Sequence, residues 1–215
     1  MMYIYYSDLN KLLPDKTFRK HLDSMPIHIQ ADTLRYIQCH DRHTRLYGKL
    51  LLKKGLKELG FSDEVLSGMV YSPFSRPYLK EIHHIDFNIS HSNNLVVCAI
   101  SNDNTRLGID TQFIQQIDFN DFRFVMNDHQ WEIIHQSQSP QSTFFKFWTI
   151  KESVIKADGR GMSIPLKDIP TCQTTVTLDN EKWHLKEICL NNKYSTYLAS
   201  NKPVHEIYMQ KCEFN

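Results

Sequence analysis

Apolar and polar residues change their spacing at several points along the chain, and each change predicts a different kind of element. Residues 3–6 read YIYY, which is typical of a strand. Between about residues 18 and 59, leucines and isoleucines recur at helix-like intervals, and Gly60 ends the last predicted helix. Prolines at 73 and 77 then interrupt regular structure.

Strand-like texture returns over residues 86–112, where the runs DFNIS, LVVCAIS and RLGID are separated by short polar turns. This spacing predicts a meander of three strands, two of them mostly buried. A second helical region covers about residues 119–158, with a break near Pro140. The C-terminal part is again strand-like, in the runs TTVTL, WHLKEICL, YSTYLAS and EIYMQ.

The order of these elements is helices, strands, helices and strands. Segregated helices and strands predict an α+β fold rather than a parallel winding of alternating strands and helices. Both halves have the same coarse order, so a duplicated architecture is possible, although no repeat exists at the level of residue identity. We place the boundary between residues 1–104 and residues 105–215.

Composition narrows the class of protein. A chain of 215 residues with 41% hydrophobic content can bury a sizeable core. The formal net charge of +1 creates no overall field, and no apolar stretch is long enough to span a bilayer, so we expect neither nucleic acid nor a membrane as partner. The five scattered cysteines form no C-x-x-C motif, and the N-terminus does not resemble a signal peptide, which favours a cytoplasmic location.

Residues 148–161 read WTIKESVIKADGRG and concentrate opposite charges on one predicted helix. Trp148, Lys151, Glu152 and Lys156 fall on a common face of that helix. The ordinary interpretation is a solvated ion pair between Glu152 and Lys156, worth roughly 0.2–0.5 kcal/mol. A tryptophan on the charged face and two glycines at the helix end favour a site instead. In that site a carboxylate would hold a metal while lysines hold phosphates.

A second group of polar residues lies upstream, in FNISHS (87–92) and LGIDTQ (107–112). Ser90 and His91 stand where a strand ends in a turn, so they could donate hydrogen bonds to an anion or simply form a polar hairpin. Asp110 follows an apolar strand segment, where an aspartate usually forms a turn. Together with Glu152 it would supply two hard oxygen ligands, the usual protein share of a magnesium site.

The segments FNISHS, GIDTQ and WTIKESVIKADGRG resemble the signatures of the 4′-phosphopantetheinyl transferases, in the larger monomeric group that activates surfactin synthetase. The resemblance is weakest before residue 40 and after residue 165. It implies two similar α+β halves related by a pseudo-twofold axis, with coenzyme A in the cleft between them. The implied reaction moves the phosphopantetheine arm of coenzyme A to a serine of an apo acyl or peptidyl carrier protein. The other product is adenosine 3′,5′-bisphosphate.

The resemblance also implies roles for the charged residues of the last two motifs. Asp110, Gln112 and Glu152 would bind Mg²⁺, and Glu152 would also act as the base that activates the carrier serine. Lys151 and Lys156 would hold the diphosphate of coenzyme A, and Lys156 would stabilise the leaving phosphate. Because charge builds on oxygens during transfer from a diphosphate, cations and positioning are expected to contribute most of the catalysis.

Five further residues are expected to contact coenzyme A. His91 would meet the 3′-phosphate, with Ser90 beside it. Arg76, in FSRPYL, stands where the family often has a lysine, and Trp148 would form part of the pocket wall. Arg45 lies in a basic helical segment that could reach the same phosphate.

One position departs from the family pattern, because Gln112 stands where these enzymes usually have glutamate. A neutral amide offers an oxygen but no charge, so we expect weaker magnesium binding. Two alternatives therefore remain. One is a magnesium-dependent hydrolase of coenzyme A-like diphosphates, and the other is a non-catalytic relative that binds coenzyme A.

The segment 113–126, FIQQIDFNDFRFVM, is apolar and aromatic with few charges. We expect a helix that faces the core. In the family this region borders the groove for the carrier protein, so Phe113, Ile117 and Phe122 are candidates for contact with a partner helix.

Overall fold

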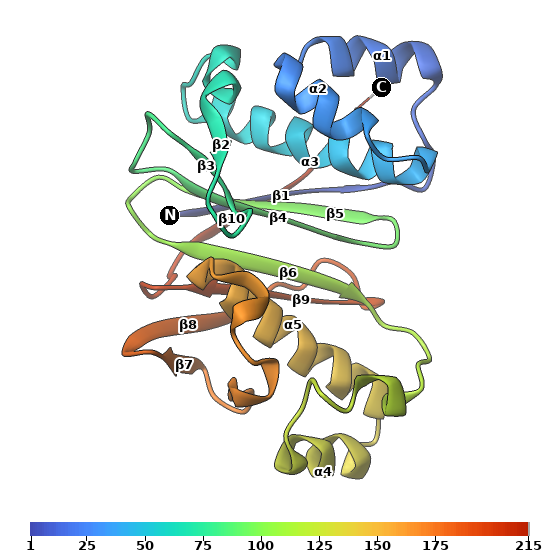
Figure 1. The fold of residues 1–215 in the computed structure, drawn as a ribbon, viewed down its shortest axis with the longest axis vertical. Coiled ribbons are helices and arrows are strands. Elements are labelled where there is room, and N and C mark those ends of the chain that lie inside the picture. Colours follow the sequence, from blue (N-terminus) through green and yellow to red (C-terminus); the bar gives the residue numbers. More distant parts are fainter. Residues whose placement is uncertain (215) are drawn as a thin grey trace.

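The computed structural model describes residues 1–214, apart from the side chain of Met162, and it has a mixed α+β fold. Two four-stranded sheets lie between a group of helices at one end of the molecule and a second group at the other (Figure 1). The strand order of the first sheet is β10 (Ile207–Lys211), β1 (Met2–Asp8), β5 (Leu95–Ser101) and β4 (Asp86–Ser92). The order of the second is β6 (Leu107–Phe113), β9 (Tyr194–Ser200), β8 (Glu181–Glu187) and β7 (Thr175–Leu178).

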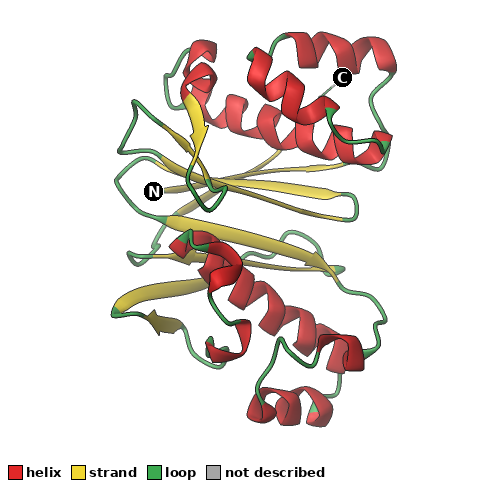
Figure 2. Ribbon diagram, viewed as in Figure 1, coloured by secondary structure: helices red, strands yellow, loops and turns green. Residues whose placement is uncertain are grey.

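The first sheet is covered by helices from the N-terminal part of the chain, as Figure 2 shows. The helix α3 (Cys39–Glu58) packs against β1 and β5, and its leucines join the buried cluster that contains Tyr5 and Ile100. The shorter helices α1 (Asp15–Asp23) and α2 (Ile27–Leu34) pack against α3. A 3₁₀ turn η1 (Asp63–Gly68) then leads into the hairpin of β2 (Met69–Tyr71) and β3 (Pro77–Leu79).

The second sheet is covered by α5 (Pro140–Asp158), which packs along β6 and β9. Pro140 begins this helix, where its fixed φ is compatible with the first turn, so the predicted break at this point is confirmed. Gly159 ends the helix with a left-handed φ of 90°, and its N–H donates to the Ile155 carbonyl. The remaining elements are η2 (Phe119–Phe122), α4 (Asp128–Gln136), η3 (Gly161–Ser163) and η4 (Leu166–Asp168).

Two predictions about the middle of the chain are wrong. The strands β4 and β5 do pair, but β6 pairs with β9 and so begins the second sheet instead of completing a meander. Residues 113–126 form no long helix, because β6 extends to Phe113 and only the short turn η2 follows. Asp118 accepts a hydrogen bond from the N–H of Asn120 and so starts that turn locally.

The two sheets meet along a seam in which β4 lies beside β6, each at the edge of its own sheet (Figure 1). The chain crosses this seam twice, since β10 returns to the first sheet and pairs in parallel with β1. None of the described helices is long and apolar enough to cross a membrane. The seam brings the motif FNISHS on β4 next to the motif GIDTQ on β6.

Candidate active site

Side chains from β4, β6 and α5 converge at the seam. The Lys156 ammonium donates to the Asp110 carboxylate (Nζ to Oδ1, 2.6 Å) and to the Ser90 hydroxyl (Nζ to Oγ, 2.9 Å). Ser90 in turn donates to the same Asp110 oxygen at 2.9 Å. Asp110 is only 1% exposed and Ser90 3%, so these bonds satisfy a carboxylate that has been removed from water. The structure therefore brings together residues from all three predicted motifs.

A glycine on β6 allows the close approach on which this group depends. A Cβ atom at Gly108 would collide with the backbone of Ser153 and Ala157, so β6 and α5 pack backbone against backbone here. Glu152 and Lys156 are separated by one helical turn and line the same cavity. The sequence spacing of the third motif therefore places both charged side chains near Asp110.

Glu152 lines a cavity of about 220 Å³, together with Arg76, Asn88, Lys156 and Gly159. Burial raises the pKa of the Glu152 carboxyl, the negative charge of Asp110 raises it further, and Lys156 acts in the opposite direction. A carboxylate with a raised pKa holds a proton more readily and is a stronger base once it is ionised. Glu152 thus has both the position and the basicity to accept a proton in the cavity.

Gln112 lies beside Asp110 and donates its amide N–H to the second carboxylate oxygen (Nε2 to Oδ2, 3.1 Å). Asp110 is consequently bonded by Ser90, Gln112 and Lys156 at the same time. A glutamate at position 112 would add a negative charge next to Asp110. The amide instead donates a hydrogen bond to the Asp110 carboxylate without adding a charge.

The carboxylate oxygens of Asp110 and Glu152 suit a hard cation that takes few of its ligands from the protein. Asp110 and Glu152 are close enough for one charge to raise the pKa of the other, and a cation bound there would relieve that repulsion. In the described part of the chain, no three histidine, cysteine, aspartate or glutamate residues form a metal-binding cluster. A divalent ion here would therefore need oxygens from water or a phosphate ligand.

His91 and Arg45 lie on the same side of the site, on β4 and α3. Partial burial, together with the cations of Arg45 and Lys156, lowers the pKa of His91 to about 4, although the residue is exposed to solvent. The Arg45 guanidinium stacks on the ring of Tyr36 at 4.7 Å from its centroid. These groups form a positive, partly aromatic surface that suits an anion such as a phosphate.

Lys151 does not join the predicted site. Its side chain is 0% exposed, and its ammonium donates to the Gln130 amide oxygen and to the carbonyls of Leu166 and Ile169 at 2.7–3.1 Å. Burial lowers its pKa to about 7. Lys151 and Lys156 are five residues apart, about 140° around an α-helix, which explains why only one of them reaches Asp110. The predicted diphosphate contact through Lys151 is thus corrected to a structural role.

Arg76 lines the cavity, but its guanidinium already donates hydrogen bonds to other protein groups. Its guanidinium forms a bidentate ion pair with Asp86 and donates to the carbonyls of Leu107 and Lys156 at 2.7–3.0 Å. The CδH₂ group also fills the space above Gly159, where a Cβ would approach it to 2.9 Å. The glycine at the helix end therefore admits the Arg76 side chain.

Trp148 lies on α5 away from the cavity of Glu152. Its ring packs against Phe122 and Phe144, with centroids 5.4 and 5.7 Å apart. It belongs to the aromatic cluster that holds the segment after β6 against α5. Phe113 and Ile117 of that segment are half-buried, and Phe124 is 65% exposed.

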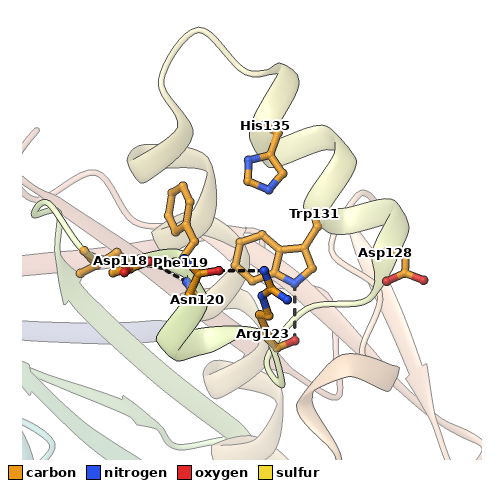
Figure 3. A pocket seen from close by; sticks show the side chains of 8 residues that line it. Asp118, Phe119, Asn120, Arg123, Asp128, Trp131 and His135 are labelled. Carbon is orange, nitrogen blue, oxygen red and sulfur yellow. Dashed lines mark hydrogen bonds between the residues drawn. The ribbon is translucent and has the colours of Figure 1, made fainter.

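A larger cavity, of about 700 Å³, opens between η2 and α4 (Figure 3). Figure 3 shows His135 above the indole of Trp131, whose N–H points to the Arg123 carbonyl at 3.5 Å. None of the residues that line this cavity belongs to the group around Asp110. Its lining residues are Ile117, Asp118, Phe119, Asn120, Arg123, Asp128, Trp131 and His135.

Sequence reasoning missed three residues that shape the site, namely Asp86, Asn88 and Gly108. Asp86 holds Arg76, Asn88 lines the cavity of Glu152, and Gly108 permits the contact with α5. All three lie in or next to the quoted motifs. Their polar or minimal side chains within buried strands were the available signal.

Comparisons with known proteins agree with the motifs. The family model of the 4′-phosphopantetheinyl transferase superfamily matches residues 106–203. The chain is 38% identical over 161 residues to the 4′-phosphopantetheinyl transferase gsp of Aneurinibacillus migulanus, a match covering 71% of this chain and 65% of that protein. It is 31% identical over 137 residues to 4′-phosphopantetheinyl transferase Sfp of Bacillus subtilis (strain 168), covering 61% and 59%.

A putative 4′-phosphopantetheinyl transferase of Haemophilus influenzae is 29% identical over 169 residues, covering 74% of this chain and 69% of that protein. The chain thus matches 65%, 59% and 69% of the lengths of these three curated relatives. Motifs, family model and relatives all indicate the same group. Over residues 106–203 the chain is similar to the 4′-phosphopantetheinyl transferase superfamily, and over most of its length it resembles transferases of the surfactin-synthetase-activating type such as gsp and Sfp.

Proposed function

We propose that this protein transfers the 4′-phosphopantetheine arm of coenzyme A to a serine of an apo acyl or peptidyl carrier protein. Adenosine 3′,5′-bisphosphate is the second product. The observation that carries the proposal is the grouping of Asp110, Glu152 and Lys156 at the seam, beside a cavity that Glu152 lines. The names of the curated relatives, all phosphopantetheinyl transferases, support the same activity.

We place coenzyme A in a cleft between two α+β halves, residues 1–104 and residues 105–215, related by a pseudo-twofold axis. The support is that each half contributes one sheet and one long helix, α3 or α5, although β10 returns to the first sheet. In this proposal the protein is cytoplasmic and acts as a monomer. The monomer is supported because one chain already holds both halves.

Transfer proceeds by attack of the carrier serine oxygen on the phosphorus that bears the pantetheine arm. As that oxygen–phosphorus bond forms, the bond from the same phosphorus to the bridging diphosphate oxygen breaks. Glu152 accepts the hydroxyl proton, for which its raised pKa suits it. Lys156 neutralises the charge that develops on the departing phosphate oxygen.

We also propose that Asp110 and Glu152 would hold Mg²⁺, with Gln112 as a neutral third contributor. When bound, it would supply neutralisation of the diphosphate charge and leave the remaining coordination to phosphate and water oxygens. The repulsion between the two carboxylates supports the assignment. Because Gln112 adds no charge, we expect the affinity for the ion to be lower than with glutamate at this position.

The remaining contacts with coenzyme A come from the positive surface. His91 and Arg45 meet the 3′-phosphate, whose charge would favour the protonated imidazole. Arg76 flanks the ligand at the cavity while it holds the backbone of α5. Ser90 is buried and supports the pocket from behind, whereas Trp148 packs against Phe122 outside the cavity of Glu152.

The carrier protein docks, in this proposal, over the segment 113–126. Phe113 and Ile117 are half-buried there, and the exposed Phe124 offers further apolar surface. Phe122 is turned toward Trp148 and Phe144 and supports the segment from inside.

The test is to mix the protein with coenzyme A, Mg²⁺ and an apo carrier protein, and to weigh the intact carrier by mass spectrometry. We expect the carrier to gain one phosphopantetheine. A Glu152→Ala variant and a sample with a metal chelator should leave the carrier unmodified. Several carriers are tested, since the chain does not indicate which one it modifies.

The same experiment separates the alternatives. Release of phosphopantetheine without any carrier would indicate a hydrolase. Binding of coenzyme A with every carrier unmodified would indicate a non-catalytic relative. In that case Gln112→Glu is the first change to make, because it restores the charge that the family pattern contains at this position.

A further inference from the structure

The strands β4 and β6 are joined by an unusual set of hydrogen bonds across the seam. Four backbone N–H groups of β6 donate to side chains of β4, and every second residue takes part on both strands. The pairs are Leu107 to Asp86 (2.8 Å), Ile109 to Asn88 (3.0 Å), Thr111 to Ser90 (3.2 Å) and Phe113 to Ser92 (2.9 Å). We call the four accepting side chains of β4 the acceptor row.

The acceptor row provides hydrogen-bond partners for the N–H groups at the free edge of β6. One side of β6 pairs with β9, so the N–H groups on its other side need partners. Alternate residues of a strand point to the same face, and in β4 these are short polar residues that reach the backbone of β6. Donor and acceptor are 21 residues apart in each pair, so the row defines a single register of β6 against β4.

The row is connected directly to the charged group of the site. Besides the N–H of Thr111, the Ser90 hydroxyl contacts the Asp110 carboxylate and the Lys156 ammonium, each at 2.9 Å. At the other end, Asp86 binds Arg76, whose Nε donates to the backbone carbonyl of Lys156 at 2.9 Å. The row therefore contacts both the strand that carries Asp110 and the helix end that carries Lys156.

We propose that the acceptor row positions Asp110 against Lys156, with Ser90 as a positioning residue and not a contact to coenzyme A. Ser90 is 3% exposed and Asn88 6%, which agrees with a role inside the protein. The effect on turnover rests on the proposed transferase function. The effect on the seam does not, so the two are measured separately.

The first measurement is amide hydrogen exchange by NMR, which requires no activity. We expect Ser90→Ala to speed exchange at the Thr111 amide, and Asn88→Leu at the Ile109 amide, by about tenfold each. The matched control is Thr196→Val, which removes a buried hydroxyl bond to Thr111 on the opposite edge of β6. It should leave the Ile109 amide unchanged. Unaltered exchange at Thr111 and Ile109 in the row variants would overturn the proposal.

The second measurement is steady-state transfer to a carrier protein. Ser90→Ala should lower kcat by roughly ten- to a hundredfold, because Asp110 and Lys156 lose their shared partner, while the KM for coenzyme A stays unchanged. Ser90→Thr, which keeps the hydroxyl, should recover most of kcat. A raised KM with unchanged kcat would instead make Ser90 a contact to coenzyme A and overturn its positioning role.

The outcomes remain separable if a variant or the function fails. Should Ser90→Ala not fold, Asn88→Leu is used for both measurements, with faster exchange at the Ile109 amide and a lower kcat as the expected results, and Ser90→Thr is the control that should retain wild-type values of both. If the wild-type protein modifies no carrier, the proposed function is wrong. Exchange at the Ile109 and Thr111 amides then still decides whether the acceptor row joins the two sheets.

Discussion

At the scale of single residues, the site depends on a buried carboxylate that accepts hydrogen bonds from three neighbours. Asp110 would be costly to bury alone, and the donors from Ser90, Gln112 and Lys156 compensate that cost. Glu152 is in a different environment, because burial and the charge of Asp110 favour its protonated form. Two carboxylates in such different environments can take different roles, and the raised pKa of Glu152 suits it to act as the base.

Glu152→Gln should stabilise the free protein and abolish transfer. Since the pKa of Glu152 is higher in the folded than in the unfolded state, folding takes up a proton at pH values between the two. This contribution to stability is present at low pH and is lost as the pH rises through the folded pKa. Thermal unfolding in chelator at several pH values should show this decline in the wild type. The variant should have a higher Tm near neutral pH and a smaller decline.

Lys151→Met should destabilise the protein without changing the KM for coenzyme A. The variant removes the Lys151 donor from three buried oxygens, each of which keeps one other donor, at a cost of about 1–3 kcal/mol. The pKa of Lys151 is lowered from 10.5 to about 7, so the unfolded chain binds more protons in that range and stability rises with pH there. Denaturant unfolding at pH 7 and pH 9 measures both effects. A large rise in KM would restore the predicted contact with the diphosphate.

At the scale of elements, α5 serves the core on one face and the site on another. The prediction of this helix from the sequence succeeded because three signals agree on its bounds. These are the helical spacing of its apolar residues, Pro140 at its start and Gly159 at its end. The segment 113–126 was misread as a helix, since its aromatic residues pack against α5 instead of forming a helix of their own. The pairing of β6 was also misread, because an apolar strand after a short turn fits either sheet, and only tertiary packing decides which edge it joins.

Gly108→Ala is the sharpest test of how β6 and α5 fit together. The added methyl group meets helix backbone and not a flexible side chain, so the strand or the helix must move. We expect a loss of about 1–3 kcal/mol in unfolding free energy and a loss of transfer, since Asp110 and Lys156 would separate. The control is Gly68→Ala, where no atom lies within 4 Å of the new Cβ. Equal stability of the two variants would contradict the close packing.

At the scale of the whole molecule, the seam joins two sheets that no backbone ladder connects in the described residues. The seam is held together by side chains of the acceptor row, by the Arg76–Asp86 ion pair and by the returning strand β10. The motifs supplied Ser90, Asp110 and Lys156, which the structure brings together from β4, β6 and α5, but Lys151 and Trp148 of the third motif lie elsewhere. The run EIYMQ was predicted as a strand, but its parallel pairing with β1 was not, since a pairing between the two ends of the chain leaves no local signal in the sequence.

Removal of β10 should weaken both the first sheet and the seam. A chain that ends at residue 203 leaves the β1 edge unpaired and takes Ile207 from the apolar cluster between the sheets. We expect the Tm to fall by roughly 5–10 °C, given about 2–4 °C per kcal/mol for a domain of this size. A synthetic peptide of residues 204–215 should restore the Tm, whereas the same peptide with Gln210→Pro, which removes an N–H on the side of β10 that faces β1, should not. An unchanged Tm of the shortened chain would mean that β10 is dispensable and that residues 1–104 form a self-sufficient half.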